Sequence, residues 1–230
     1  MTVSEDGTPQ LVKEMVDADV LTDPAESYRF TQEFTERCET FEAEIESLSR
    51  SQLRDELARF TSSSAETDAL LDVSDRAPST LAEFLALSEI AEEGALTQTD
   101  VLTMVSALDS FGEETPPSDG SPEAFLPVSG ERIPLLVTIY GKAIVYVWLD
   151  DCDPCETVRA DLDEIFDDVP DDMALFSVYG PDHASLLAEE YDVNGGPAVL
   201  FFRDREIDAR LYGAQYQDVL DTEIRKHRDL

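Results

Sequence analysis

The sequence WLDDCDPC, residues 148–155, places Cys152 and Cys155 three positions apart. An apolar run from Ala143 to Leu149 leads directly into the first cysteine, and an amphipathic stretch begins after Pro154. This order predicts a buried strand, a tight connection and the start of a helix. At a helix start, unpaired backbone N–H groups and the helix dipole favour the ionised form of Cys152. Cys155 would lie one turn further in and be less exposed.

A second motif, Gly195-Gly196-Pro197, leads into the apolar run AVLFF at 198–202. Together the two motifs resemble the thioredoxin family, whose active site is W-x-x-x-C-x-P-C and whose opposing loop carries a cis-proline before a buried strand. The resemblance covers residues 125–230. It implies an α/β fold class for these residues: a C-terminal thioredoxin-like fold, with a central mixed sheet flanked by helices. Helical periodicity in the N-terminal half predicts that a small all-α domain precedes this fold.

The resemblance also implies a role for each residue of the motifs. Cys152 would be the nucleophile that attacks a target disulfide, and Cys155 would resolve the mixed disulfide by closing the Cys152–Cys155 bond. Pro197 would be the cis-proline, and Trp148 the tryptophan beside the active site. Four neighbouring residues would contact the substrate: Asp153, Pro154, Gly195 and Gly196. The implied partners are protein disulfide substrates and a thioredoxin reductase or other dithiol donor, with no cofactor.

Three positions depart from the family pattern. Tyr146 stands two residues before Trp148, where the family often buries an acid that relays protons. Asp151 replaces a second tryptophan, and Glu156 follows the second cysteine in place of a basic residue. Acidic neighbours disfavour the Cys152 thiolate by like-charge repulsion. Because stabilised thiolates make strong oxidants, this surround favours a reductant.

The chain is strongly acidic, with 52 Asp and Glu against 16 Lys and Arg and a net charge of -36 over 230 residues. The carboxylates are spread along both halves at helical spacing, which indicates a solvated surface rather than a disordered tail. Self-repulsion opposes compaction, but the Debye length falls to about 3 Å at 1 M salt. The composition therefore predicts a protein of an extreme halophile. Acidic pairs such as Asp150-Asp151, Asp167-Asp168 and Asp171-Asp172 belong to that surface, since no calcium-loop spacing appears.

Length and punctuation predict two domains. A linker is expected at 113–124, where three prolines occur. We expect an N-terminal tail at 1–22, a helical bundle at 23–112 and the thioredoxin-like domain at 125–230. The first residues show neither basic residues nor an apolar core, so we expect no secretory signal and a cytoplasmic protein.

The N-terminal half shows helical periodicity. Asp23-Pro24-Ala25-Glu26 has the residues of a helix start. The expected helices follow in order: a stripe of Phe30, Phe34, Cys38, Phe41, Ile45 and Leu48; a short helix with Leu53, Leu57 and Phe60; one from Thr80 through Ile90 to Gly94; and one from Thr97 to Gly112. On the stripe, Cys38 is expected to be a small buried hydrophobe, and a resolving role remains an alternative.

The C-terminal half alternates between strands and helices. We expect helices at 131–140, 154–169, 181–191 and 214–227, and strands at 143–149, 173–179, 198–203 and 207–211. This is the strand and helix order of the thioredoxin family. The right-handed crossover between the first two strands would place Cys152 at the carboxyl edge of the sheet.

Several alternatives compete with this interpretation. Residues 133–149 approach the length of a membrane span, but Gly141-Lys142 interrupts them. The last two N-terminal helices could form a DNA-binding motif, but residues 97–112 contain no Lys or Arg for phosphate. We therefore expect neither a membrane nor nucleic acid as a partner.

A zinc site would need Cys152, Cys155 and Cys38 to converge with His183 or His227. Their spacing does not indicate a site, and both histidines are expected at the surface. The competing function is an adaptor or chaperone-like module, in which the helical domain binds a partner and the cysteines are inert or regulatory.

The charge generates the first prediction. Lowering the salt from multimolar KCl to about 0.01 M lengthens the Debye length to about 30 Å, so that carboxylates repel across the whole surface. We expect the melting temperature to fall or the fold to be lost on desalting. Circular dichroism during a KCl titration checks this, and a melting temperature independent of salt would contradict it.

Overall fold

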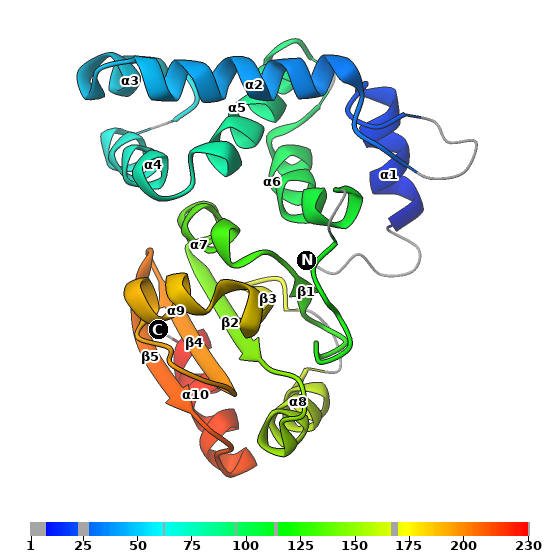
Figure 1. Ribbon diagram of the computed structural model, residues 1–230, viewed down its shortest axis with the longest axis vertical. Helices are drawn as coiled ribbons and strands as arrows, with labels where there is room; N and C mark the ends of the chain where they lie inside the picture. The colour runs from blue at the N-terminus through cyan, green and yellow to red at the C-terminus, as the bar shows by residue number, and fades with distance from the viewer. Residues whose placement is uncertain are drawn as a thin grey trace. The chain divides into compact units, whose positions relative to one another are not determined.

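The computed structural model describes residues 8–22, 28–61, 63–94, 96–112, 115–166 and 170–229. The chain divides into two compact units, one ending at Thr115 and the other running from Pro116 (Figure 1). We describe each unit by itself.

The first unit is helical. Its helices are α1 (Thr8–Asp17), α2 (Gln32–Ser47), α3 (Arg50–Leu57), α4 (Ser64–Arg76), α5 (Pro78–Glu92) and α6 (Gln98–Ala107), followed by the 3-10 turn η1 (Leu108–Phe111). Helix α5 is the centre of this unit, because apolar residues are buried along its length from Leu81 to Ile90. An all-α N-terminal half was predicted, and the fold class is confirmed.

Two helices of this unit were missed by the sequence analysis. Residues 1–22 were expected to be a tail, yet α1 forms within them because Leu11, Val12 and Met15 give it an apolar face that is buried. Helix α4 lies where no helix was expected. The Ser63 side chain caps α4 by accepting a hydrogen bond from Glu66 N at 3.2 Å. The first turn of α4 is polar, and its apolar face, which includes the buried Leu70, follows later in the helix.

Helix α2 begins later than the sequence indicated. Thr31 caps it by accepting a hydrogen bond from Phe34 N at 3.1 Å, whereas the expected start at 23–26 lies outside the described residues. The stripe of α2 buries Phe34, Phe41 and Ile45. Cys38 is only half-buried, so the expectation of a buried thiol is wrong. It lies at the edge of that apolar face rather than at its centre.

The second unit contains a mixed sheet of five strands in the order β1-β3-β2-β4-β5. The strands are β1 (Leu126–Pro127), β2 (Lys142–Trp148), β3 (Ala174–Tyr179), β4 (Ala198–Arg203) and β5 (Glu206–Tyr212). Strands β1 and β2 run parallel to β3, β4 runs antiparallel to β2, and β5 runs antiparallel to β4. The predicted mixed sheet is confirmed, and only the two-residue β1 was not foreseen.

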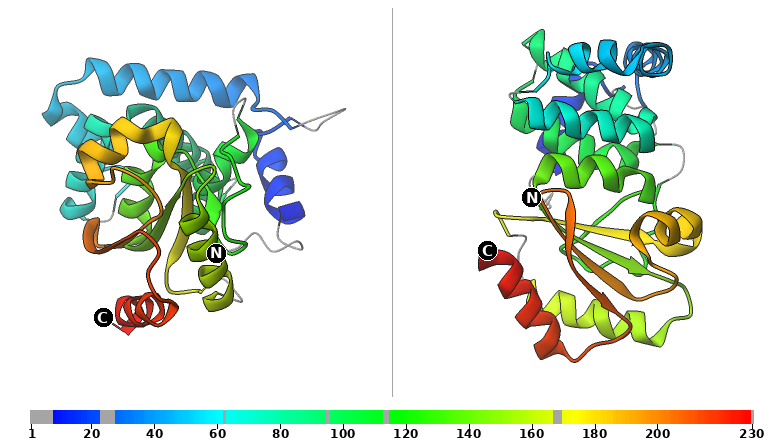
Figure 2. Two further views of the ribbon diagram at one scale, coloured as in Figure 1. Left: turned by 60° about the horizontal axis from the view of Figure 1, so that its bottom comes forward. Right: turned by 90° about the vertical axis from the view of Figure 1, so that its left-hand side faces the viewer.

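Helices cover both faces of this sheet. They are α7 (Ile133–Tyr140), α8 (Asp153–Ile165), α9 (Ala184–Tyr191) and α10 (Gln217–Asp229), with 3-10 turns η2 (Gly130–Arg132) and η3 (Gly180–His183). Alternate residues of β2 point to opposite faces. Ala143, Val145 and Val147 join the core under α7 and α9, and Ile144, Tyr146 and Trp148 join the core under α8 and α10 (Figure 2).

The apolar stretch 133–149 therefore folds as α7 and β2, separated by Gly141 at φ 69°. Of the helices in the described part of the chain, none is both long enough and apolar enough to cross a membrane.

His227, expected at the surface, is buried with 1% of its area exposed. It lies on the inner side of α10, 5.5 Å from the Phe201 ring and with Nδ1 3.8 Å from the Asp208 carboxylate. Arg203 and Lys142 donate hydrogen bonds to the carbonyl oxygens of His227 and Arg228, at 2.7 and 3.1 Å. These cations hold the C-terminal end of α10 against the sheet. His183 is half-buried beside Ser129.

Burial lowers the pKa of His227, nearby Arg203 and Lys142 lower it further, and Asp208 opposes them. A neutral ring is thus favoured in the fold, and the unfolded chain binds the proton more readily. The contribution of the neutral His227 ring to the free energy of unfolding is present above the ordinary pKa of 6.5 and is lost as the pH falls below that value.

We therefore expect the free energy of unfolding to fall as the pH is lowered from about 8 to about 5, and to fall less in a His227→Phe variant. Denaturant melts at each pH measure this difference. The control is His183→Gln, which changes the chain's other histidine and should keep the parent's pH dependence. Equal pH dependence in the parent and His227→Phe would contradict the assignment.

Candidate active site

Cys152 and Cys155 are joined by a disulfide at the N-terminus of α8. Cys152 is the N-cap residue, and its Sγ accepts a hydrogen bond from Cys155 N at 3.2 Å. Cys152 is half-buried, whereas Cys155 is 4% exposed. The sulfur that an incoming molecule can reach is thus the one that the helix N-terminus favours as a thiolate.

The residues between strand and helix produce this geometry locally. Asp151 adopts a left-handed backbone conformation, with φ 49°, which turns the chain sharply after β2. Asp153 and Pro154 occupy the first turn of α8, where proline lacks an N–H that would have had no helical partner anyway. Both side chains are exposed beside the disulfide.

The loop Gly195-Gly196-Pro197 lies against the buried sulfur. A Cβ placed on Gly196 would come 3.5 Å from Cys155 Sγ and 2.9 Å from Leu149 Cγ, so a side chain there would crowd Leu149. The Gly196–Pro197 peptide bond is cis. A Cβ on Gly195 would meet no atom within 4 Å, and Pro197 O accepts a hydrogen bond from Gly213 N at 2.8 Å. The fold thus brings this loop and the two cysteines together.

Trp148 ends β2 beside the disulfide and is 3% exposed. Its ring lies 4.8 Å from that of Tyr179, and its buried Nε1–H has no hydrogen-bond partner among the residues that the structure describes. Tyr179 donates a hydrogen bond to the Asp150 carboxylate. This hydrogen bond is the main cause that raises the pKa of Tyr179 to about 12.

Tyr146 lies beneath the disulfide, at the position where the thioredoxin family often has a buried acid. It is 0% exposed, and its hydroxyl donates a hydrogen bond of 2.8 Å to the carbonyl oxygen of Cys155. Burial is the main cause that raises the pKa of Tyr146 well above its ordinary value. The residue is therefore a neutral donor that ties β2 to the first turn of α8.

A cavity of about 180 Å³ lies beside the disulfide. The residues that line it come from 119–120, from the end of β2 and from the start of α8: Asp119, Gly120, Trp148, Leu149, Asp150, Asp151, Cys152, Cys155, Glu156 and Arg159. Carboxylates outnumber the single lining cation, Arg159. A molecule that approaches this sulfur therefore meets a negative potential.

The residues of this site that sequence reasoning missed include Asp119, Gly120, Arg159 and Tyr179. Gly120 was assigned to a linker because serines, prolines and acids surround it, and only its packing on Trp148 reveals its place. Tyr179 ends the neighbouring strand β3, and its strand pairing with Trp148 could have pointed to it. The described residues hold no group of three or more His, Cys, Asp or Glu side chains arranged for a metal ion.

A family model for thioredoxin matches residues 136–226. Similar solved structures include a mutant thioredoxin from Halobacterium salinarum NRC-1, with 24% identity over 48% of this chain and 96% of that one, at a TM-score of 0.41. Thioredoxin f from spinach chloroplast (short form) is 16% identical over 44% of this chain and 91% of that one, at a TM-score of 0.40. Thioredoxin f2 from Chlamydomonas reinhardtii is 19% identical over 46% of this chain and 98% of that one, also at a TM-score of 0.40. No curated protein matches the chain.

The family match coincides with the mixed sheet and its helices. The C-terminal unit therefore has a thioredoxin-family fold. It carries a Cys-x-x-Cys disulfide. The family match and this disulfide together support a general class of protein, the thiol-disulfide oxidoreductases.

The buried phenol generates the third prediction. Replacing Tyr146 by Phe removes the hydrogen bond to Cys155 O, and we expect the free energy of unfolding of the oxidised protein to fall by about 1 kcal/mol. Tyr179→Phe is the matched control, because its hydrogen bond to Asp150 is exposed to solvent and its loss should leave stability within error of the parent. Denaturant melts in concentrated KCl measure both, and equal losses would contradict the anchoring role.

Proposed function

We propose that the C-terminal unit is a thiol-disulfide oxidoreductase that reduces disulfides of target proteins in the cytoplasm of a halophile. The observation that carries this proposal is the position of the disulfide: at the N-terminus of α8, with one sulfur reachable, the other buried, and the Gly196–Pro197 loop against it.

The reaction runs from the reduced pair. The Cys152 thiolate attacks one sulfur of the target disulfide, an intermolecular S–S bond forms, and the other target sulfur leaves as a thiolate that takes up a proton. Cys155 then loses its proton to solvent and attacks Cys152 Sγ, which closes the Cys152–Cys155 bond and releases the second target sulfur. The target gains two electrons and two protons, and the cysteine pair loses them. A thioredoxin reductase or another dithiol donor restores the pair.

The contacts around each sulfur support this division of roles. Cys155 N–H points at Cys152 Sγ and favours a thiolate there. The burial of Cys155 leaves it able to attack only a sulfur that is already bonded to Cys152. The open space beside Gly195, with the backbone of Gly196 and Pro197, offers a place for an extended target segment. Asp153 and Pro154 would contact the target on the helix side.

The direction of electron flow follows from the charges. The carboxylates of the lining oppose a negative charge on Cys152. Pairs with a less stabilised thiolate are weaker oxidants, which favours a reducing role in the cytosol. The net charge of -36 supports a cytosol rich in salt, where this repulsion is screened.

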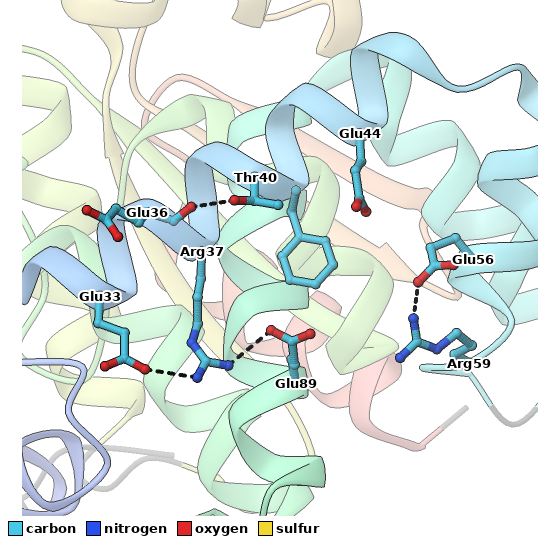
Figure 3. Close-up of a pocket in the computed structure, with 9 residues that line it drawn as sticks. Glu33, Glu36, Arg37, Thr40, Glu44, Glu56, Arg59 and Glu89 are labelled. Atoms are coloured by element: carbon cyan, nitrogen blue, oxygen red, sulfur yellow. Dashed lines mark hydrogen bonds and ion pairs between the residues drawn. The ribbon is translucent and has the colours of Figure 1, made fainter.

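A cavity in the helical unit favours a second candidate function, an adaptor. It measures about 330 Å³ and lies among α2, α3 and α5 (Figure 3). Its arginines are held by glutamates: Arg37 binds Glu33 and Glu89 at 3.0 Å, and Arg59 binds Glu56. A preformed cavity of this kind can hold a partner's side chain whether or not the cysteines react.

Trapping of mixed disulfides tests the proposed function and separates it from the adaptor. In a Cys38→Ser background, which removes the half-buried third cysteine, Cys155→Ser should accumulate disulfide-linked targets in concentrated KCl, because nothing resolves them. Non-reducing gel electrophoresis and mass spectrometry identify the complexes. The matched control is Cys152→Ser, which lacks the attacking sulfur and should trap none.

Turnover completes the test. The Cys38→Ser parent should reduce insulin with a dithiol donor, and both single-cysteine variants should lose this activity by at least about 100-fold. Partner binding that survives in Cys152→Ser, together with a parent that reduces no disulfide, would select the adaptor and reject the reductase.

A further inference from the structure

Residues 119–124, which the composition assigned to a linker, are packed together with Phe125 onto the thioredoxin-fold unit. Ser121 Oγ lies 2.6 Å from Ser177 Oγ on β3, and Glu123 N donates a hydrogen bond of 2.7 Å to Asp163 Oδ1 on α8. Phe125 is buried, with its ring 6.4 Å from that of Tyr146. We call residues 119–125 the site strap. It is bound to the sheet on one side and to α8 on the other.

Gly120 lies directly on the indole of Trp148. A Cβ at this position would come closer than 3.0 Å to three carbon atoms of the ring, a separation that real Cβ atoms do not adopt. Overpacking of this kind forces neighbouring groups to move. The absence of a side chain at residue 120 is therefore what allows the site strap to cover Trp148.

The site strap also forms a wall of the cavity that contains the disulfide. Asp119 and Gly120 line this cavity with Trp148 and Cys152, and the loop residues 195–197 do not. The disulfide thus has two separate borders. One is the Gly196–Pro197 loop against Cys155, and the other is the site strap with the indole that it holds.

We propose that Gly120 is a specificity-determining residue of the redox site: it seats Trp148, and the resulting wall receives the target segment beside the cysteine under attack. This inference rests on the reductase function proposed above. A protein target would fill the cavity that the site strap borders, so its binding depends on this wall. A small disulfide that needs only the Cys152 sulfur does not.

The test substitutes Ala for Gly120 in the full chain and uses two substrates, insulin and a small aromatic disulfide dye. We expect KM for insulin to rise about tenfold, while kcat/KM for the dye stays within about twofold. Trp148 is the only tryptophan in the sequence, so its fluorescence reports directly on how the indole packs against residue 120. Its emission should shift to longer wavelength in Gly120→Ala as the indole moves toward solvent.

Two further variants control the test. Ser118→Ala changes an exposed side chain near Gly120 and should match the parent in emission and in both substrates. Ser121→Ala removes the hydrogen bond to Ser177 without adding atoms near Trp148. It should raise KM for insulin less than Gly120→Ala does, and it decides the question if Gly120→Ala does not fold.

Parental emission and parental KM in the strap variants would overturn the inference. So would an equal loss with insulin and dye, because Gly120 would then act on the cysteines themselves rather than on target selection. A parent that reduces neither substrate would reject the proposed function and the inference together. If the parent is active and Gly120→Ala and Ser121→Ala match it in KM and emission, the inference alone is rejected.

Discussion

Burial of β2 on both faces is the constraint on which the C-terminal unit depends. Each residue from Ala143 to Trp148 is buried, and alternate side chains enter the two cores under different helices. Burying one such apolar side chain contributes about 1.5–3 kcal/mol. A shift of the strand by one residue would move each side chain into the opposite core, where the packing is made for a side chain of another size and shape. The position of β2 determines where the strand ends at Trp148 and where the turn at Asp151 begins. Through the hydrogen bond of Tyr146, it also determines where Cys155 lies. The positions of the two cysteines thus follow from the packing of the central strand.

Electrostatics act on this framework in the opposite direction. With 16 Lys and Arg against 52 acids, the cations gain most where carboxylates or carbonyl oxygens converge. Arg37 bridges α2 and α5 through Glu89 and Glu93, and Lys142 and Arg203 hold the last carbonyls of α10. Around the disulfide, several carboxylates line the cavity together with one cation, Arg159. High salt screens the repulsion between exposed carboxylates but affects buried contacts much less. A fold with this charge can therefore stay compact in concentrated salt.

The redox site then combines two segments that are distant in sequence. The Gly196–Pro197 loop reaches the buried sulfur from one part of the chain. The site strap reaches the indole of Trp148 from the residues that follow the helical unit. In the proposed function the loop supplies backbone to the target, and the strap shapes what lies beside it. In this proposal, a segment with the composition of a linker is part of the substrate site.

The sequence by itself determined that the first half is helical and how strands and helices follow one another along the second. These features are local, because periodicity, caps and turn residues act over a few positions. The roles to test at Cys152, Cys155 and Pro197 came from the resemblance of the motifs to the thioredoxin family. Tertiary structure alone decided that α1 has a core to bury against, that His227 lies inside and that Gly120 touches Trp148. Each of these depends on side chains from distant segments meeting in space. Residues 119–124 have the composition of a linker, and only the sheet and α8 provide the partners that Ser121, Glu123 and the adjoining Phe125 contact.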